Sequence, residues 1–340
     1  MLNFNNTHFQ DNQTFWWFYD DTEETDTERF PFATFVGTVA SIGLTGNILL
    51  FFMTFHKNIS QHSYAIYLRI TAISDTMVLL QTATEDILDH LGLLTSFHLM
   101  SFHFCKVWLV CYSLFRTTSP WFVVTLSLDR CIAIWKPLQR SRYCSKKAAW
   151  VICLIIGCVA FVGTVAVLSE ALTDVGVSDE SCGEIHVSDV TLKAGTYFNL
   201  FLQSTLPCVF LLILNIMVAI QIIRSLKFRR SFSAEDSNST RAAIRTTLPL
   251  ILVSVLAFVT LLPVSITGVY EMGNILNRGE EYEFSFHRHT VDTVWAICNI
   301  IYLINFAQNF YILFGSSNNY RCIMRDMVCK CSYRAGRPTV

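Results

Sequence analysis

The stretch TTLPLILVSVLAFVTLLPVSITGVY at residues 246–270 contains no charged side chain. A helix that crosses a lipid bilayer needs about 20 predominantly apolar residues, so this stretch is long enough to span one. Four further uncharged runs reach that length, at residues 32–55, 148–169, 194–223 and 293–320. These runs predict a membrane protein whose chain crosses the bilayer at least five times.

Two more segments qualify as spans if charges inside them are accepted. Residues 107–128 hold only Arg116, and residues 64–91 hold several charges, Asp75 among them. The whole chain is 52% hydrophobic and only 15% charged, whereas a soluble domain carries about 25% charged residues. We therefore predict an all-α membrane protein, a seven-transmembrane helix bundle followed by a short amphipathic cytoplasmic helix.

Basic and acidic residues divide unequally between the two sides of this bundle. With the N-terminus outside, the cytoplasmic side holds 17 Lys and Arg and the outer side holds five, which agrees with the positive-inside rule. Acidic residues divide the other way, with 19 outside and three inside. We expect a multi-pass plasma-membrane protein with an extracellular acidic N-terminal arm (residues 1–31), a seven-transmembrane domain (residues 32–314) and a cytoplasmic helix and tail (residues 315–340). In the arm, Asn5 and Asn12 begin Asn-x-Thr sequons, so we expect glycosylation there.

Charged groups inside a membrane span are energetically costly and commonly mark function. Asp75 lies in the middle of its span, and Ser119, Asn305 and Asn309 lie at a matching depth on other spans. A carboxylate with hydroxyl and amide oxygens suits a hard cation, so a bound sodium ion at Asp75 is one reading. The other is a hydrogen-bond network that only joins helices. We expect no other cofactor or metal.

Glu85, Asp86 and Arg116 lie nearer the outer side. Arg116 could pair with Glu85, which would satisfy both charges, or the three groups could line a ligand pocket open to the outside. Residues at similar depth complete the expected pocket: Tyr112, Asn199, Gln203, Tyr270, Glu271, Trp295, Asn299 and Tyr302.

The adjacent pair Asp129 and Arg130 ends the third span. An acid and a base side by side could hold a resting state whose release exposes a cytoplasmic face, or they could form a static pair.

No serine–histidine, paired-carboxylate or histidine-cluster arrangement occurs at spans of matching depth, so we expect no enzyme. The chain also shows no internal repeat, which argues against a transporter.

Several short motifs follow one another at the spacing of a single receptor family. They are Gly46-Asn47, Asp75, the LDRC of residues 128–131, Trp150, Pro207, Pro263, residues 305–313, and Tyr320-Arg321. With these motifs in this order, the chain resembles class A (rhodopsin-like) G-protein-coupled receptors over about residues 30–330. The resemblance implies signalling through heterotrimeric G proteins, with no nucleic-acid partner. It also implies a disulfide between Cys105 and Cys182. Cys329 and Cys331 suit palmitoylation, although chance also places cysteines in such a tail.

Finer features resemble invertebrate neuropeptide receptors of the FMRFamide, myosuppressin and proctolin type. They are Asn309-Phe310 in place of Asn-Pro, Asn215 eight residues after Pro207, and a short third inner loop. This resemblance implies an extracellular peptide ligand, and the acidic outer face suits a cationic one. The acidity could instead serve solubility alone, and a non-peptide chemosensory ligand fits the same fold.

Other positions depart from the family pattern. Tyr112 stands where amine receptors carry aspartate, and the seventh span has no lysine for a retinal Schiff base, which argues against a monoamine receptor and against an opsin. Leu261 and Leu313 replace a tryptophan and a tyrosine that act as switches in the family. Pro120 inside the third span predicts a kink near Arg116. These changes leave the strength of G-protein coupling open.

Overall fold

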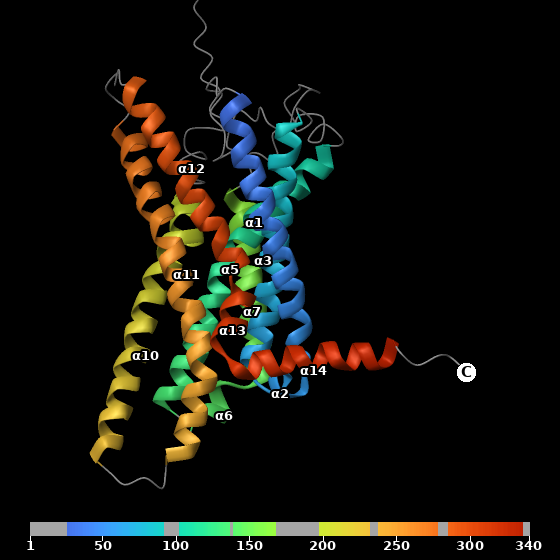
Figure 1. Ribbon diagram of the computed structural model, residues 1–340. Coiled ribbons are helices and arrows are strands. Elements are labelled where there is room, and N and C mark those ends of the chain that lie inside the picture. Colours follow the sequence, from blue (N-terminus) through green and yellow to red (C-terminus); the bar gives the residue numbers. More distant parts are fainter. Residues whose placement is uncertain are drawn as a thin grey trace, which may run out of the picture.

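The computed structural model describes residues 26–91, 102–136, 139–167, 197–231, 237–277 and 285–335, which form helices and contain no strand. The long helices run side by side as one bundle, and α14 lies across one end of it (Figure 1), here called the α14 end. The elements are α1 (Asp26–Met53), α2 (Lys57–Ser60), α3 (Tyr64–His90), α5 (Phe102–Trp135), α6 (Arg140–Tyr143), α7 (Lys146–Val167), η2 (Asn199–Thr205), α10 (Leu206–Ser231), α11 (Ser237–Asn277), α12 (Ser285–Ala307), α13 (Asn309–Ser316) and α14 (Asn318–Ala335).

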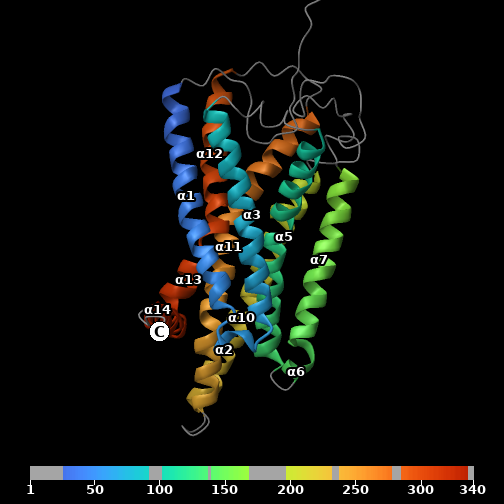
Figure 2. The same ribbon diagram turned by 90° about the vertical axis from the view of Figure 1, so that its right-hand side faces the viewer.

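Apolar length alone identifies only part of this bundle as membrane-spanning. Four described stretches are long and apolar enough to cross a bilayer: Thr34–Met53, Lys146–Val167, Leu200–Arg224 and Thr247–Tyr270. A fifth span is broken, because Ala296–Ala307 and Asn309–Ser316 meet at an angle of 59°. The predicted spans with internal charges are nevertheless long helices: α3 lies beside α1, and α5 lies beside α7 (Figure 2). The all-helical bundle predicted from the sequence is confirmed.

Helix α1 approaches its neighbours closely at one glycine. A Cβ atom added to Gly43 would lie 2.5 Å from Leu79 Cδ1 on α3 and 2.7 Å from the Ala307 Cβ at the end of α12. At Gly37, six residues earlier on α1, nothing lies within 4 Å of such an atom. The absence of a side chain at Gly43 therefore lets three helices meet.

A π-helical turn, η2, precedes α10 and ends just before Pro207. In a π-helix the N–H of residue i donates to the carbonyl of residue i−5, so the backbone N–H of residue 207 would be the expected donor to the Leu202 carbonyl. Proline has no N–H, and Trp121 Nε1 on α5 donates to the Leu202 carbonyl instead, over 2.9 Å. The fifth span is thereby joined to α5. Helix α5 itself runs unbroken through Pro120.

Candidate functional site

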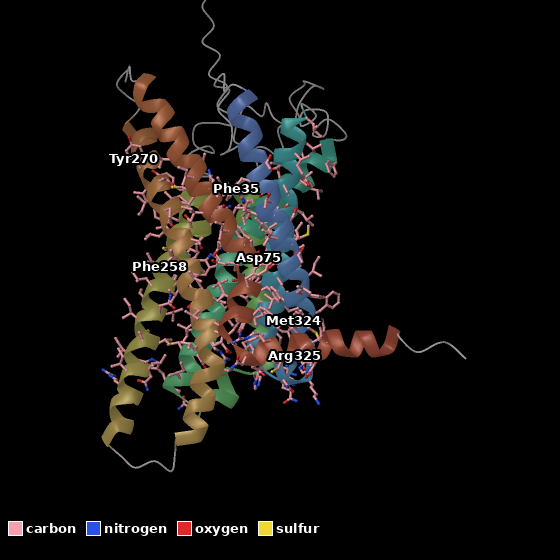
Figure 3. The ribbon with its side chains drawn as sticks, viewed as in Figure 1. Phe35, Asp75, Phe258, Tyr270, Met324 and Arg325 are labelled. Carbon is pink, nitrogen blue, oxygen red and sulfur yellow. The ribbon has the colours of Figure 1, made fainter. Side chains whose placement is uncertain are left out.

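Asp75 on α3 lies at mid-height in the bundle, between the end that holds Tyr270 and the end that holds Arg325 (Figure 3). Its side chain is fully buried. Ser119 Oγ on α5 donates to one carboxylate oxygen, and Asn309 Nδ2 on α13 donates to the other over 2.8 Å. The break between α12 and α13 turns the chain here, so that the first residue of α13 faces α3. Two of the three partners expected for Asp75 are thus present.

Asn305, the third expected partner, takes part in a different group. Its Oδ1 lies 3.2 Å from Thr260 Oγ1 on α11, and Gln308 Nε2 lies 3.4 Å from that hydroxyl. Asn305 therefore links α12 to α11. The buried Oδ1 atom of Asn309, whose amide nitrogen donates to Asp75, has no hydrogen-bond partner among the described residues. The carboxylate of Asp75, the hydroxyl of Ser119 and the buried amide oxygen of Asn309 form a donor set that fits a small hard cation.

Toward the end of the bundle opposite α14, Arg116 is a buried cation held between two aromatic rings. Its Cζ lies 4.4 Å from the ring centroid of Tyr112 on its own helix and 5.4 Å from that of Tyr302 on α12. Tyr302 is buried and packs edge-to-face against Phe306 at 4.9 Å. Cation–π contacts of this kind are worth about 0.5–2 kcal/mol and become stronger as water is excluded. The structure brings Arg116, Tyr112 and Tyr302 of the expected pocket together.

Glu85 on α3 has a partner that the sequence did not indicate. Trp108 Nε1 on α5 donates to Glu85 Oε1 over 2.6 Å. The pairing of Glu85 with Arg116 stays a prediction. Both charged residues are nonetheless held by aromatic side chains of α5.

The other expected pocket residues are less closely associated. Gln203 on η2 and Asn299 on α12 are partly buried. Tyr270 on α11 is 53% exposed and contacts no side chain of the described Arg116 cluster through a hydrogen bond or ring. The side chains of Asp86, Asn199, Glu271 and Trp295 lie outside the described part of the structure, as do those of Cys105, Cys329 and Cys331. Asn5, Asn12 and Cys182 lie outside the described residues altogether.

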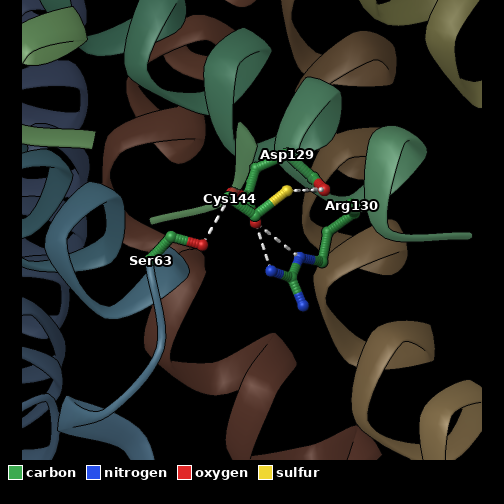
Figure 4. A network of polar contacts seen from close by, with 4 residues as sticks. All are labelled: Ser63, Asp129, Arg130 and Cys144. Carbon is green, nitrogen blue, oxygen red and sulfur yellow. Dashed lines mark hydrogen bonds and ion pairs between the residues drawn. The ribbon is translucent and has the colours of Figure 1, made fainter. Parts of the chain in front are cut away.

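At the α14 end, Asp129 and Arg130 are both buried and form an ion pair (Figure 4). Ser63 Oγ, directly before α3, donates to Asp129 Oδ1 over 2.6 Å, and Cys144 Sγ lies 3.5 Å from the Asp129 backbone carbonyl (Figure 4). The Arg130 guanidinium also lies 4.6 Å from the ring centroid of Tyr64. The pair therefore connects α5 to the start of α3 and to the segment before α7.

The first turn of α14 approaches the same arginine. Tyr320 on α14 is buried. Burial raises the pKa of its hydroxyl above the usual value for tyrosine, and the positive charge of Arg130 opposes that rise. The tail helix is thus coupled electrostatically to the Asp129–Arg130 pair.

Positions where family switches are missing are occupied by packed leucines. Leu261 and Leu313 are both fully buried. Seven residues before Leu261 on α11, Ser254 Oγ donates to Asn215 Oδ1 on α10 over 2.5 Å. Helix α11 is therefore hydrogen-bonded to α10 on one side and, through Thr260, to α12 on the other.

Residues 46–312 match the model of the family described as 7 transmembrane receptor (rhodopsin family). The matched range covers more than half of the chain and contains both Asp75 and the Asp129–Arg130 pair. The chain belongs to the rhodopsin family of seven-transmembrane receptors. Membership implies a multi-pass membrane receptor that couples to a G protein, and it excludes an enzyme.

A curated relative of the receptor is Melanopsin-B of Xenopus laevis, which is 31% identical over 123 residues. The aligned stretch covers 36% of the receptor but only 22% of the relative. A similarity this short does not assign the relative's ligand to the receptor.

Proposed function

We propose that the receptor binds an extracellular peptide between the ends of the helices opposite α14 and signals through a heterotrimeric G protein. The observation that carries this proposal is the cluster of Arg116 with Tyr112 and Tyr302. A buried guanidinium with aromatic walls suits a ligand that presents a carboxylate, an amide carbonyl or an aromatic ring. The acidic residues assigned to the outer side would attract a peptide that is cationic elsewhere.

The orientation belongs to the same proposal. With the N-terminus outside, the α14 end faces the cytoplasm and the basic residues of the inner loops face the G protein. Asp129 and Arg130 then stabilise the resting receptor, and ligand binding favours the state in which this contact is released. The domain limits at residues 31 and 314 follow from the same arrangement.

The similarity to Melanopsin-B favours a second candidate, an opsin-like receptor. A retinal Schiff base requires the amine of a lysine, and the receptor has no lysine between Lys227 and Lys330. The whole of α12 and α13 lies in that interval. The peptide receptor is therefore the better-supported function, and a non-peptide chemosensory ligand is its nearest alternative.

Sodium at Asp75 is a further part of the proposal. Asp75, Ser119 and Asn309 would hold the ion, which would supply a positive charge at a buried carboxylate. We expect Asp75→Asn to remove any effect of sodium on thermal stability, because an amide carries no charge to pair with the ion. Thermal stability is also measured in potassium at the same ionic strength, because charge screening affects stability equally in both salts whereas specific binding of sodium does not.

The function is tested by applying amidated and free peptides to the expressed receptor and measuring guanine-nucleotide exchange on G proteins of each class. We expect a cationic peptide to activate it, and Arg116→Gln to weaken that peptide's potency by about tenfold or more. Trp150→Phe is the control, because Trp150 on α7 is 51% exposed and lies outside the expected pocket. Activation by retinal and light, with no response to any peptide, would contradict the proposal.

A further inference from the structure

Arg69 is a charged residue inside the apolar part of α3, and its side chain is held in a fixed orientation. Its Nε donates to Thr54 Oγ1 over 3.1 Å, and its Nη2 donates to the Thr54 backbone carbonyl over 3.3 Å. Its Cζ lies 3.8 Å from the ring centroid of Phe55. Thr54 follows the last residue of α1, so Arg69 caps that helix and satisfies one of its terminal carbonyls.

This capping role engages only one edge of the guanidinium. An arginine carries five N–H donors, and Nε with Nη2 forms one side of the planar group. The end of the group, where Nη1 and Nη2 present two parallel N–H bonds, makes no hydrogen bond to any described residue. No described carboxylate forms an ion pair with Arg69 either. Its charge therefore has no acidic partner in the part of the protein that the structure describes.

The surroundings of Arg69 are lipid-facing. Ile73 and Leu80 follow on the same face of α3, and their side chains are 45% and 43% exposed. Phe52 on α1 and Phe55, two residues beyond its end, are 59% and 52% exposed. In a membrane bundle, exposed apolar side chains of this kind contact lipid.

The depth of Arg69 suits the lipid headgroups. It lies five residues after Tyr64, the first residue of α3, which corresponds to about 8 Å of helix rise. Long cationic side chains at this depth extend to the boundary between acyl chains and headgroups. Lys57 on the neighbouring α2 adds a second exposed cation at the α14 end, where nitrogen-bearing side chains gather (Figure 3).

We propose that Arg69 binds the phosphate of an anionic phospholipid at the surface where the end of α1 meets α3. Two parallel N–H bonds match two phosphate oxygens, a geometry that arginine provides and lysine does not. In the proposed orientation this end faces the cytoplasmic leaflet, where anionic lipids are concentrated. The Thr54 and Phe55 contacts hold the guanidinium in place before the lipid arrives, which lowers the entropic cost of binding.

The proposal is tested by native mass spectrometry of the purified receptor titrated with phosphatidylserine and phosphatidylinositol 4,5-bisphosphate against phosphatidylcholine. We expect Arg69→Gln to weaken retention of the anionic lipids by about tenfold. Arg142→Gln is the matched control, because Arg142 is also exposed at the α14 end and stacks on Tyr143. Its lipid retention should stay within about twofold of the unaltered receptor.

A second variant tests the geometry if Arg69→Gln does not fold. Arg69→Lys keeps the charge but loses the planar fork, so we expect anionic lipid retention to fall severalfold while phosphatidylcholine retention is unchanged. Equal losses in the Arg69 and Arg142 variants would mean diffuse attraction to the basic end and would overturn the proposal. Displacement of the lipid by inorganic phosphate alone would also overturn it, because the site would then recognise a free anion.

Discussion

Replacing Trp121 with phenylalanine isolates a single hydrogen bond between α5 and the fifth span. The ring can still pack against Phe210, whose centroid lies 5.6 Å from that of the indole. The Leu202 carbonyl loses its donor, and Pro207 cannot supply another. An unsatisfied buried carbonyl plus a lost hydrogen bond costs about 1–2 kcal/mol. The expected fall in melting temperature is roughly 2–8 °C.

Buried cysteines allow this fall to be measured without a ligand. Cys153, Cys208 and Cys298 are buried free thiols, so a thiol-reactive fluorophore reports their exposure as the purified receptor unfolds. Trp150→Phe is the matched control, because Trp150 on α7 is 51% exposed. If Trp121→Phe melts within about 1 °C of that control, the hydrogen bond does not stabilise the fold.

A double-mutant cycle tests the cause of the effect. Pro207→Ala restores a backbone N–H that can serve the Leu202 carbonyl, so Trp121→Phe should cost much less in that background. If the two substitutions are additive instead, Trp121 does not compensate for Pro207 and its role is packing alone.

Three further predictions address packing and activation. Gly43→Ala should destabilise the receptor by about 1–3 kcal/mol, because the new methyl group overlaps Leu79 on α3 and Ala307 on α12. Gly37→Ala is the control and should be neutral or slightly stabilising. The thiol-exposure assay measures the stability of both variants. Ser254→Ala removes the hydrogen bond to Asn215, so we expect a smaller population of receptors in which α11 packs against α10 and a severalfold higher basal rate of nucleotide exchange. An unchanged spin-label distance between the inner ends of α10 and α11 would refute this expectation. Arg130→Ala should abolish agonist-driven exchange at unchanged surface expression, and a normal response would exclude Arg130 from activation.

The depth of a residue in a span follows from the sequence, but its rotation about the helix axis does not. Depth placed Ser119 and Asn309 at the level of Asp75, and both contact it. Asn305 lies at a similar depth, yet its side chain points to Thr260. Successive residues of an α-helix are about 100° apart, so depth and direction are independent.

Neutral hydrogen-bond donors were the residues that the sequence did not reveal. Trp108, Trp121 and Ser63 carry no charge, so nothing distinguishes them from their surroundings in a hydropathy pattern. Their partners lie far away along the chain, as the separation of Trp121 and Leu202 illustrates. Only the folded structure brings such pairs together. A charged residue inside a span is different, because the high free energy of an unpaired charge in lipid already predicts that it has a partner.

The missing aromatic switches bear on how strongly the receptor couples. Leu261 and Leu313 are packed and cannot donate or accept hydrogen bonds, so α11 is held by neutral contacts through Ser254 and Thr260. Each such contact contributes about 0.5–1.5 kcal/mol, so opening α11 at these two points costs about 1–3 kcal/mol. A ligand that prefers the open state by roughly 5- to 150-fold supplies that free energy. On this argument the loss of the aromatic switches lowers the barrier to opening, and we expect a coupled receptor with measurable basal activity rather than a silent binder.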